Sequence, residues 1–258
     1  MPEYAMTRLA RRGVPMLLSA VILAGGAVAV PAAPAGAIAR PAATVSTVVP
    51  SAAVRWAPTW TTTLRSGTKG SAVRAAQLRL IALGYWVGSP DGEYGSQTAQ
   101  AVLALQKTVG APRTGVLDRQ VRNVLTAGIR PKARTTTGTT LEIDLRRQLL
   151  LVVVHGRTVW AFNTSTGSGK YYYQKGHRYL ATTPKGRFSI TRQIEGVRVA
   201  PLGVLFRPKY FTGGYALHGS SSIPGYPASH GCVRVSNAAI NYLWASRLTP
   251  IGRRFWVY

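Results

Sequence analysis

The sequence predicts an α+β protein of two domains, a small three-helix bundle followed by a mostly-β domain. Two features of the pattern support this fold class. Between residues 64 and 126, apolar residues recur at helical spacing in short runs that end at glycines. After residue 140 the pattern changes to the continuous and alternating apolar runs that are typical of strands. Residues 127–139, rich in threonine and basic residues, are the predicted linker between the two domains.

Three helices are expected in the first domain, over Val73–Leu83, Thr98–Val109 and Asp118–Leu125. Each segment places its apolar residues on one face at the spacing of an amphipathic helix. Gly84 ends the first helix and Thr114-Gly115 follows the second, because glycine tolerates the backbone angles that end a helix. Three short helices with tight turns predict a small bundle over residues 64–126.

The second domain, residues 140–258, is expected to be mostly strands. Leu141–Val154 is taken as one strand and Arg157–Phe162 as the next, joined by a hairpin turn at His155-Gly156. Asn237–Trp244 has the pattern of a helix, and Phe255–Tyr258 that of a final strand. The domain is therefore predicted to be β-rich with one or two helices.

The first 37 residues have the pattern of a signal peptide. A basic segment at residues 8–12 precedes the apolar run Val14–Val30, and small residues allow cleavage after Ala37. An uncleaved membrane anchor is the alternative, because the apolar run is near the shortest length that spans a bilayer. Either way the chain is expected to be exported, to the cell wall or a periplasm-like space. Residues 38–63 are the predicted flexible spacer.

The chain is strongly basic, with 32 Lys and Arg against 7 Asp and Glu and a formal net charge of +25. The basic residues are spread along the chain rather than gathered in a block with interleaved aromatics. This distribution argues against a dedicated nucleic-acid-binding arm, although weak binding to any polyanion is expected. For an exported protein, an anionic cell envelope is the natural partner.

Cys232 is the only cysteine of the chain, and two histidines lie near it in sequence, His218 and His230. A single cysteine forms no internal disulfide, so it is either a packing residue or a reactive group. An imidazole near a thiol can accept its proton, and the thiolate is the nucleophile. Inert packing of the cysteine is the alternative from residue types alone.

Two families resemble the two halves of the chain. Residues 64–126 resemble a peptidoglycan-binding domain, through Gly70-Ser71-x-Val73, Gln77-x-x-Leu80, Leu83-Gly84-Tyr85, Asp91-Gly92-x-Tyr94-Gly95, Thr98, Ala101-Val102 and Gln106. Residues 140–258 resemble the YkuD-type catalytic domain of L,D-transpeptidases, through Ile143-x-Leu145, Ser165-Thr166-Gly167, Thr183-Pro184-x-Gly186-x-Phe188, His218-Gly219 and Ser229-His230-Gly231-Cys232-Val233-Arg234. Together the resemblances cover the chain except the signal peptide and the spacers.

The resemblance implies a cysteine enzyme without a cofactor that cross-links peptidoglycan stem peptides. Cys232 is expected to attack the donor stem and release D-alanine, with His218 as principal base and His230 as a polarising partner. Arg234 is expected to bind a substrate carboxylate, a role suited to a planar guanidinium. The remaining predicted substrate-binding residues are Gly231, Ser229 and Gly219. Carbapenem-type β-lactams are expected to acylate the same cysteine.

Other interpretations of the same residues stay open. Hydrolysis of the thioester would make the enzyme an L,D-carboxypeptidase, and a non-catalytic wall-binding protein is a further alternative. A zinc site built from His218, His230 and Cys232 is a further alternative, although no recognised metal spacing accompanies these residues. The cross-link type, the oligomeric state and the physiological role in wall organisation and cell shape do not follow from the sequence.

The chain departs from some relatives in one position, where Gly219 replaces a serine after the first histidine. A backbone carbonyl or Ser220 is then expected to orient His218. The serine of the main motif, Ser229, is expected to form structural hydrogen bonds rather than to act as a nucleophile. Aromatic residues in two segments are candidates either for the wall of a substrate cleft or for the core: Tyr171–Tyr173 and Phe206–Phe211.

Overall fold

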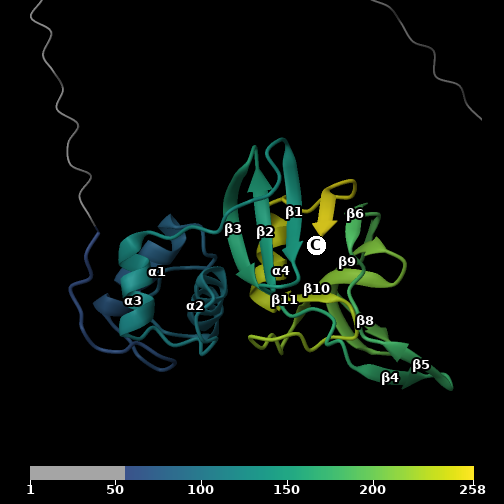
Figure 1. The fold of residues 1–258 in the computed structure, drawn as a ribbon, viewed down its shortest axis with the longest axis horizontal. Coiled ribbons are helices and arrows are strands. Elements are labelled where there is room, and N and C mark those ends of the chain that lie inside the picture. Colours follow the sequence, from purple (N-terminus) through teal and green to yellow (C-terminus); the bar gives the residue numbers. More distant parts are fainter. Residues whose placement is uncertain (1–55) are drawn as a thin grey trace, which may run out of the picture. The chain divides into compact units, whose positions relative to one another are not determined.

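The computed structural model describes residues 56–258, in which helices precede strands and one further helix lies near the C-terminus (Figure 1). This arrangement confirms the predicted α+β class, with a helical bundle followed by a mostly-β domain. The predicted signal peptide, residues 1–37, and residues 38–55 of the spacer lie outside the described residues. Within residues 56–258, no helix has the length and apolar character needed to span a membrane.

The bundle consists of α1 (Ser71–Ala82), α2 (Ser96–Val109) and α3 (Arg119–Ala127). The bounds agree with the sequence pattern to within a few residues. The carboxylate of Asp118 accepts a hydrogen bond from the Val121 backbone N–H at 2.9 Å and so caps the start of α3. At the other end of α2, Gly110 takes the left-handed conformation, with a φ of 72°, that commonly ends a helix.

Residues 56–63, which were expected to belong to the flexible spacer, pack on the bundle instead. Trp60 is buried in the bundle core, and Trp56 lies beneath the guanidinium of Arg79 at 5.0 Å. Arg122 also donates a hydrogen bond to the Thr61 carbonyl at 2.7 Å. The buried Trp60 and the partly buried Trp56 supply apolar contact with the bundle that the composition of this segment does not reveal.

The first sheet of the β domain has the strand order β3-β2-β1-β12-β6. Its strands are β1 (Thr139–Asp144), β2 (Leu149–Val154), β3 (Arg157–Asn163), β6 (Gly186–Ser189) and β12 (Arg254–Val257). The prediction of one strand over Leu141–Val154 is therefore wrong, because a turn at residues 145–148 folds the run back as the antiparallel pair β1–β2. The predicted hairpin turn at His155-Gly156 does join β2 to β3.

Strand β2 is buried on both faces, which explains its uninterrupted apolar sequence. Leu150 and Val152 point into the core between the two sheets. Leu149, Leu151 and Val153 point to the other face and join the core of the helical bundle. Helix α2 packs on β2 and β3, so residues 56–258 form one compact unit with the helices against one face of the sheet.

The second sheet carries the site and has the order β11-β10-β9-β7, with β8 paired to β9. Its strands are β7 (Arg192–Gln193), β8 (Val197–Ala200), β9 (Gly203–Thr212), β10 (Tyr215–Ser220) and β11 (Val233–Ser236). Helix α4 (Asn237–Ala245) follows β11 directly, and the Ser236 hydroxyl caps it by accepting from the Ala239 backbone N–H at 3.1 Å. The core of the domain lies between this sheet, α4 and the first sheet.

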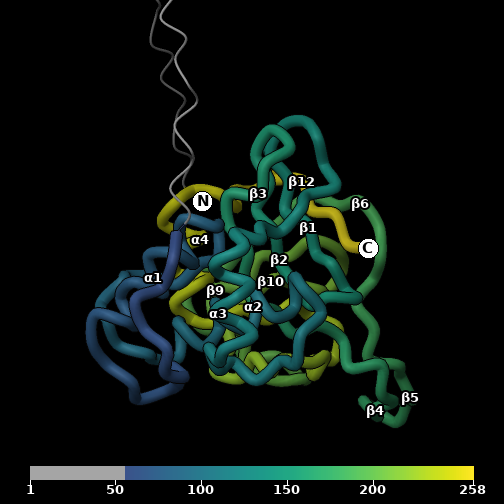
Figure 2. The backbone as a smooth tube through the Cα atoms, turned by 60° about the vertical axis from the view of Figure 1, so that its left-hand side comes forward, coloured from purple at the N-terminus to yellow at the C-terminus, as the bar shows by residue number. Residues whose placement is uncertain are grey.

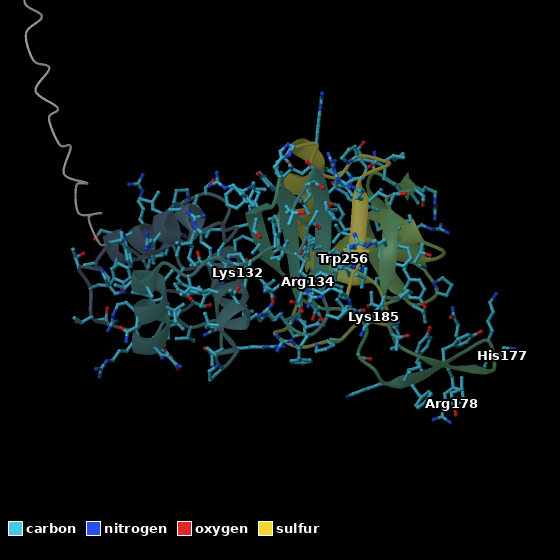
Figure 3. The ribbon with its side chains drawn as sticks, turned by 45° about the horizontal axis from the view of Figure 1, so that its top comes forward. Lys132, Arg134, His177, Arg178, Lys185 and Trp256 are labelled. Carbon is cyan, nitrogen blue, oxygen red and sulfur yellow. The ribbon has the colours of Figure 1, made fainter. Side chains whose placement is uncertain are left out.

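A separate hairpin of β4 (Tyr171–Gln174) and β5 (His177–Leu180) projects from the rest of the β domain (Figures 1 and 2). It pairs with no other strand among the described residues. Figure 3 shows His177 and Arg178 toward its far end, away from the other strands. The sequence analysis did not anticipate this hairpin, because its strands are short and mostly exposed.

Lys107 joins the bundle to the β domain from a buried position on α2. Its ammonium donates hydrogen bonds to the carbonyls of Gln148 and Thr164, each at 2.9 Å. It has no carboxylate partner among the described residues. Burial, together with the nearby charge of Arg113, lowers the pKa of Lys107 to about 7.

This lowered pKa predicts a pH dependence of stability. Above pH 7 the folded state releases the Lys107 proton, while the unfolded state keeps it up to the ordinary pKa of 10.5. Because the unfolded state then binds more protons, stability rises with pH in this window. The free energy of unfolding of the wild type should gain about 2 kcal/mol between pH 7 and 9 from this residue. The free energy of unfolding of Lys107→Met, measured by urea denaturation, should not show this gain.

The matched control is Lys170→Met, at an exposed lysine, which should retain the wild-type dependence. A Lys107→Met curve parallel to that of the wild type across this pH range would contradict the assignment.

Candidate active site

The site is built on the parallel pair β10–β11. Leu217 lies opposite Val233, and His218 lies opposite Arg234. Side chains alternate between the two faces of a strand. Leu217 and Val233 are fully buried in the core, so His218 and Arg234 share the opposite face. Cys232 directly precedes β11 and, by the same alternation, belongs to the face of Arg234 and His218.

A hydrogen-bonded turn holds Cys232 in place. The buried Ser229 hydroxyl donates to the Cys232 carbonyl at 2.6 Å and accepts from the Gly231 backbone N–H at 2.9 Å. The Ser229 backbone N–H in turn donates to the Thr166 carbonyl at 2.9 Å. These bonds occupy the Ser229 hydroxyl, which agrees with the expected structural role of this serine.

Gly231 and Gly219 were expected to contact the substrate, but neither lines the cleft described below. Gly231 has a φ of 136°, and a side chain there would collide with the ring of Tyr215 and the carbonyl of Thr182. A side chain at Gly219 would collide with Asn237 and Ile240 of α4. The N–H of Gly231 is bonded to the Ser229 hydroxyl, and both positions are packed too tightly for a side chain. Substrate contact by the two glycines stays a prediction.

The buried His218 is oriented by a backbone carbonyl. Its Nδ1 lies 2.8 Å from the Gly219 oxygen. A carbonyl oxygen can only accept, so Nδ1 must carry the proton and Nε2 presents the free lone pair. Ser220, the alternative orienter, is instead engaged with the backbone of Ser222. The backbone carbonyl of Gly219 is therefore the group that orients the ring of His218.

Burial keeps both reactive groups neutral at neutral pH. The pKa of His218 is lowered from 6.5 to about 4, mainly by burial; the hydrogen bond to Gly219 opposes this shift and the charge of Arg234 adds to it. Burial also raises the pKa of the Cys232 thiol, opposed by a backbone hydrogen bond from Ala216 and by Arg234. The cleft therefore contains a neutral thiol and a neutral imidazole, and a neutral imidazole can act as a general base.

Arg234 supplies the positive charge of the site. Its backbone is fixed by two hydrogen bonds with Ser165, at 3.0 and 3.2 Å. Its guanidinium forms no ion pair with any described carboxylate, and burial lowers its pKa from the ordinary value. A half-buried guanidinium without a protein partner is suited to bind an anionic group of a ligand.

His230 is exposed and occupies a different environment from His218. Its ring contacts Tyr172 of β4 edge-on, with centroids 4.7 Å apart. This contact links the turn that carries Cys232 to the projecting β4–β5 hairpin. The location favours His218 over His230 as the base, because only His218 is both buried and held by a hydrogen bond to its ring.

A cleft of about 400 Å³ opens over this face of the sheet. Among the predicted site residues, it brings together the following: His218, Ser229, His230, Cys232 and Arg234. The β8–β9 hairpin and Tyr172 and Gln174 of β4 supply much of the rest of the lining. Of the aromatic residues proposed from sequence, Tyr172 and Tyr210 line the cleft, whereas Phe211 is packed in the core.

Two further arginines, Arg192 and Arg198, line the cleft and were missed by the sequence analysis. The many basic residues of the domain give these two no distinguishing signal. Within residues 56–258, no group of three or more His, Cys, Asp and Glu side chains is placed to hold a metal ion.

Comparisons with known families place two domains in this chain. Residues 138–251 match the L,D-transpeptidase catalytic domain (YkuD), and residues 69–125 match a peptidoglycan-binding domain. Among solved structures, the chain is similar to an L,D-transpeptidase from Xylanimonas cellulosilytica. The two are 51% identical with a TM-score of 0.73, over 76% of this chain and 97% of the other.

Two curated proteins also share part of the sequence. The zinc D-Ala-D-Ala carboxypeptidase of Streptomyces albus G is 36% identical over 109 residues, 41% of this chain and 40% of that protein. An N-acetylmuramoyl-L-alanine amidase of Bacillus licheniformis is 39% identical over 80 residues, 30% of this chain and 22% of that protein. The chain spans two fifths or less of the length of these relatives.

The raised thiol pKa predicts how Cys232 reacts with an alkylating agent. The thiolate is the reactive form, so the rate of modification by iodoacetamide should increase steadily between about pH 6 and 9 without a plateau. Intact-protein mass spectrometry follows the reaction, and Cys232→Ala is the control, since the chain has no other cysteine. A rate that is already constant from about pH 5 would indicate a preformed thiolate and would contradict this account.

Proposed function

This chain belongs to the L,D-transpeptidases, and we propose that it is an exported enzyme that cross-links peptidoglycan stem peptides through a thioester on Cys232. One observation carries the proposal: the parallel register of β10 and β11 assigns the neutral imidazole of His218 and the guanidinium of Arg234 to one face, and the thiol of Cys232 lines the same cleft. A nucleophile, a base and an anion-binding group are the parts that acyl transfer from a peptide requires.

In the first half-reaction, Nε2 of His218 takes the proton from Sγ of Cys232 while the sulfur attacks the carbonyl carbon of the third residue of a donor stem. The carbonyl electron pair moves to the oxygen and forms a tetrahedral oxyanion. As this intermediate collapses, the C–N bond breaks and the proton on Nε2 passes to the leaving nitrogen of D-alanine. The product is a thioester between Cys232 and the donor stem.

In the second half-reaction, a side-chain amine of a neighbouring stem attacks the thioester carbon. Nε2 accepts a proton from this amine, and the C–S bond breaks as the proton returns to the sulfur. A new amide bond then joins the two stems, and the free thiol is restored. Because the hydrogen bond to Gly219 fixes the protonated nitrogen at Nδ1, the same Nε2 serves both half-reactions.

Arg234 is proposed to hold the carboxylate of the departing D-alanine. It lies opposite His218 in the strand pair, next to the base that must protonate the leaving nitrogen. Its positive charge also stabilises a thiolate on Cys232, because it lowers the thiol pKa against the effect of burial. Substrate binding and activation of the nucleophile therefore share one side chain.

The helical bundle supports the same proposal at the level of the whole chain. The match of residues 69–125 to a peptidoglycan-binding domain and the net charge of +25 both suit attachment to an anionic cell wall. The N-terminal sequence supports export, with the wall or a periplasm-like space as the site of action. Wall binding by the bundle would concentrate the enzyme near its substrate.

Trapping of the thioester tests the reaction. After incubation with a disaccharide-tetrapeptide, intact-protein mass spectrometry should show the donor stem on Cys232 with loss of D-alanine, and a cross-linked dimer should appear when an acceptor stem is added. A carbapenem-type β-lactam should leave an adduct on the same cysteine. Release of free tripeptide alone would identify a carboxypeptidase, and the absence of any adduct would favour a non-catalytic wall-binding protein.

Replacement of each histidine separates their roles. His218→Gln should lower kcat by about a thousandfold and His230→Gln by no more than about tenfold, because only His218 is proposed to transfer protons. Release of D-alanine from the tetrapeptide provides the measurement, and thermal unfolding of both variants controls for folding. Larger loss in His230→Gln than in His218→Gln would reverse the assignment of the base.

A further inference from the structure

We propose that the cleft contains a second carboxylate-binding subsite, formed by Arg192 and Arg198, which selects stem peptides with a free internal carboxylate over those with a primary amide there. This inference rests on the proposed function, because it names the substrate class of the same cleft. It concerns residues that neither sequence motif includes, and it is separate from the carboxylate assigned to Arg234.

Both arginines are placed by strand pairing around β9. Arg192 on β7 lies opposite Tyr210, and its guanidinium rests 3.8 Å from the centroid of that ring. Arg198 on β8 lies opposite Leu205. Residues paired across antiparallel strands project to the same face, so each arginine follows the face of its β9 partner. Both arginines line the cleft.

An apolar cluster connects this pair to the nucleophile. Leu205, Tyr210 and Ala216 form a small buried cluster, and Cys232 packs against it. Leu205 and Tyr210, the two β9 residues that pair with the arginines, therefore belong to the cluster against which Cys232 packs. This shared support places the arginine subsite and the reacting sulfur in one cleft, on the same side of the sheet.

No carboxylate of the β domain neutralises these arginines. The domain has three acidic residues, and each is engaged elsewhere. Glu142 is buried, where it accepts from the backbone of Arg134 and Thr135 and from the Tyr258 hydroxyl. Asp144 pairs with Arg147 at 3.1 Å, and Glu195 pairs with Arg207 at 2.7 Å.

The lining of the cleft thus contains Arg192, Arg198 and Arg234 and, among the described residues, no acid. A ligand with several anionic groups is needed to balance this charge. The contact with the Tyr210 ring positions the guanidinium of Arg192, and a planar guanidinium is suited to form paired hydrogen bonds to a carboxylate.

The chemistry of the substrate then follows from the number of arginines. Arg234 binds the carboxylate at the scissile end of the donor stem, as proposed above. Arg192 and Arg198 require a second carboxylate on the part of the stem that stays attached to Cys232. A primary amide at that position has the same shape without the charge, so it would lose the charge-assisted hydrogen bonds.

Binding to a chain that cannot react tests the subsite independently of catalysis. Two tetrapeptides are compared by calorimetry on full-length Cys232→Ala, one with a free internal carboxylate and one with a primary amide at that position. The free acid should bind about tenfold more tightly, as expected from loss of one charge-assisted hydrogen bond. Adding Arg192→Gln and Arg198→Gln should reduce this ratio to below about twofold.

The matched control replaces Arg119 and Arg157 with glutamine in the Cys232→Ala chain. Both are exposed and neither lines the cleft, so the same loss of two charges should leave the preference unchanged. Because Arg192 packs on Tyr210, Arg198→Gln alone is also measured, and it should reduce the preference without a change in thermal stability.

Equal binding of the two peptides, no measurable binding of either, or a preference that survives in the double variant would overturn the subsite. Failure of the proposed function has a different signature. It would appear as the absence of D-alanine release from either peptide by the chain that retains Cys232, whatever the calorimetry shows.

Discussion

The parallel pairing of β10 with β11 is the constraint on which the site depends. Parallel neighbours need a long connection, and residues 221–232 provide it, ending in the turn that presents Cys232. Leu217 and Val233 must face the core, so His218 and Arg234 must face the cleft. A shift of one residue would expose the apolar pair and bury the charged one. The hydrophobic core therefore sets the geometry of the reactive groups. Lys107 of the bundle also holds the β domain, through the hydrogen bond that it donates to the Thr164 carbonyl.

The same burial that fixes the geometry also sets the charge state. It lowers the pKa of His218 and raises that of Cys232, so both groups are neutral at neutral pH. The remaining charge in the cleft comes from arginines, and no acidic residue in the described part of the chain lines the cleft to neutralise them. In this account the substrate brings the negative charge, and its carboxylates align the scissile bond with the thiol.

The sequence predicted the helices because their signals are local, and the reactive residues that it indicates stay a prediction. The spacing of apolar residues located α1 to α4, and a single cysteine beside two histidines indicated the chemistry. The turn between β1 and β2 was missed because β2 is buried on both faces and its apolar run hides the boundary. The choice between the Gly219 carbonyl and Ser220 as the group that orients His218 depends on side-chain geometry that the sequence does not show. The place of Arg192 and Arg198 in the cleft depends on strand pairing between distant segments, which a single sequence does not show either.

The protonation state of His218 decides whether its Nε2 can accept the thiol proton. Nitrogen-15 NMR of imidazole-labelled protein, with His218→Gln to identify the signals, reports which ring nitrogen carries the proton and the pH at which the second is protonated. The account predicts a proton on Nδ1, a free Nε2 and a titration near pH 4, in line with the lowered pKa of about 4. A proton on Nε2 at neutral pH, or a titration at the ordinary histidine pKa of 6.5, would contradict it.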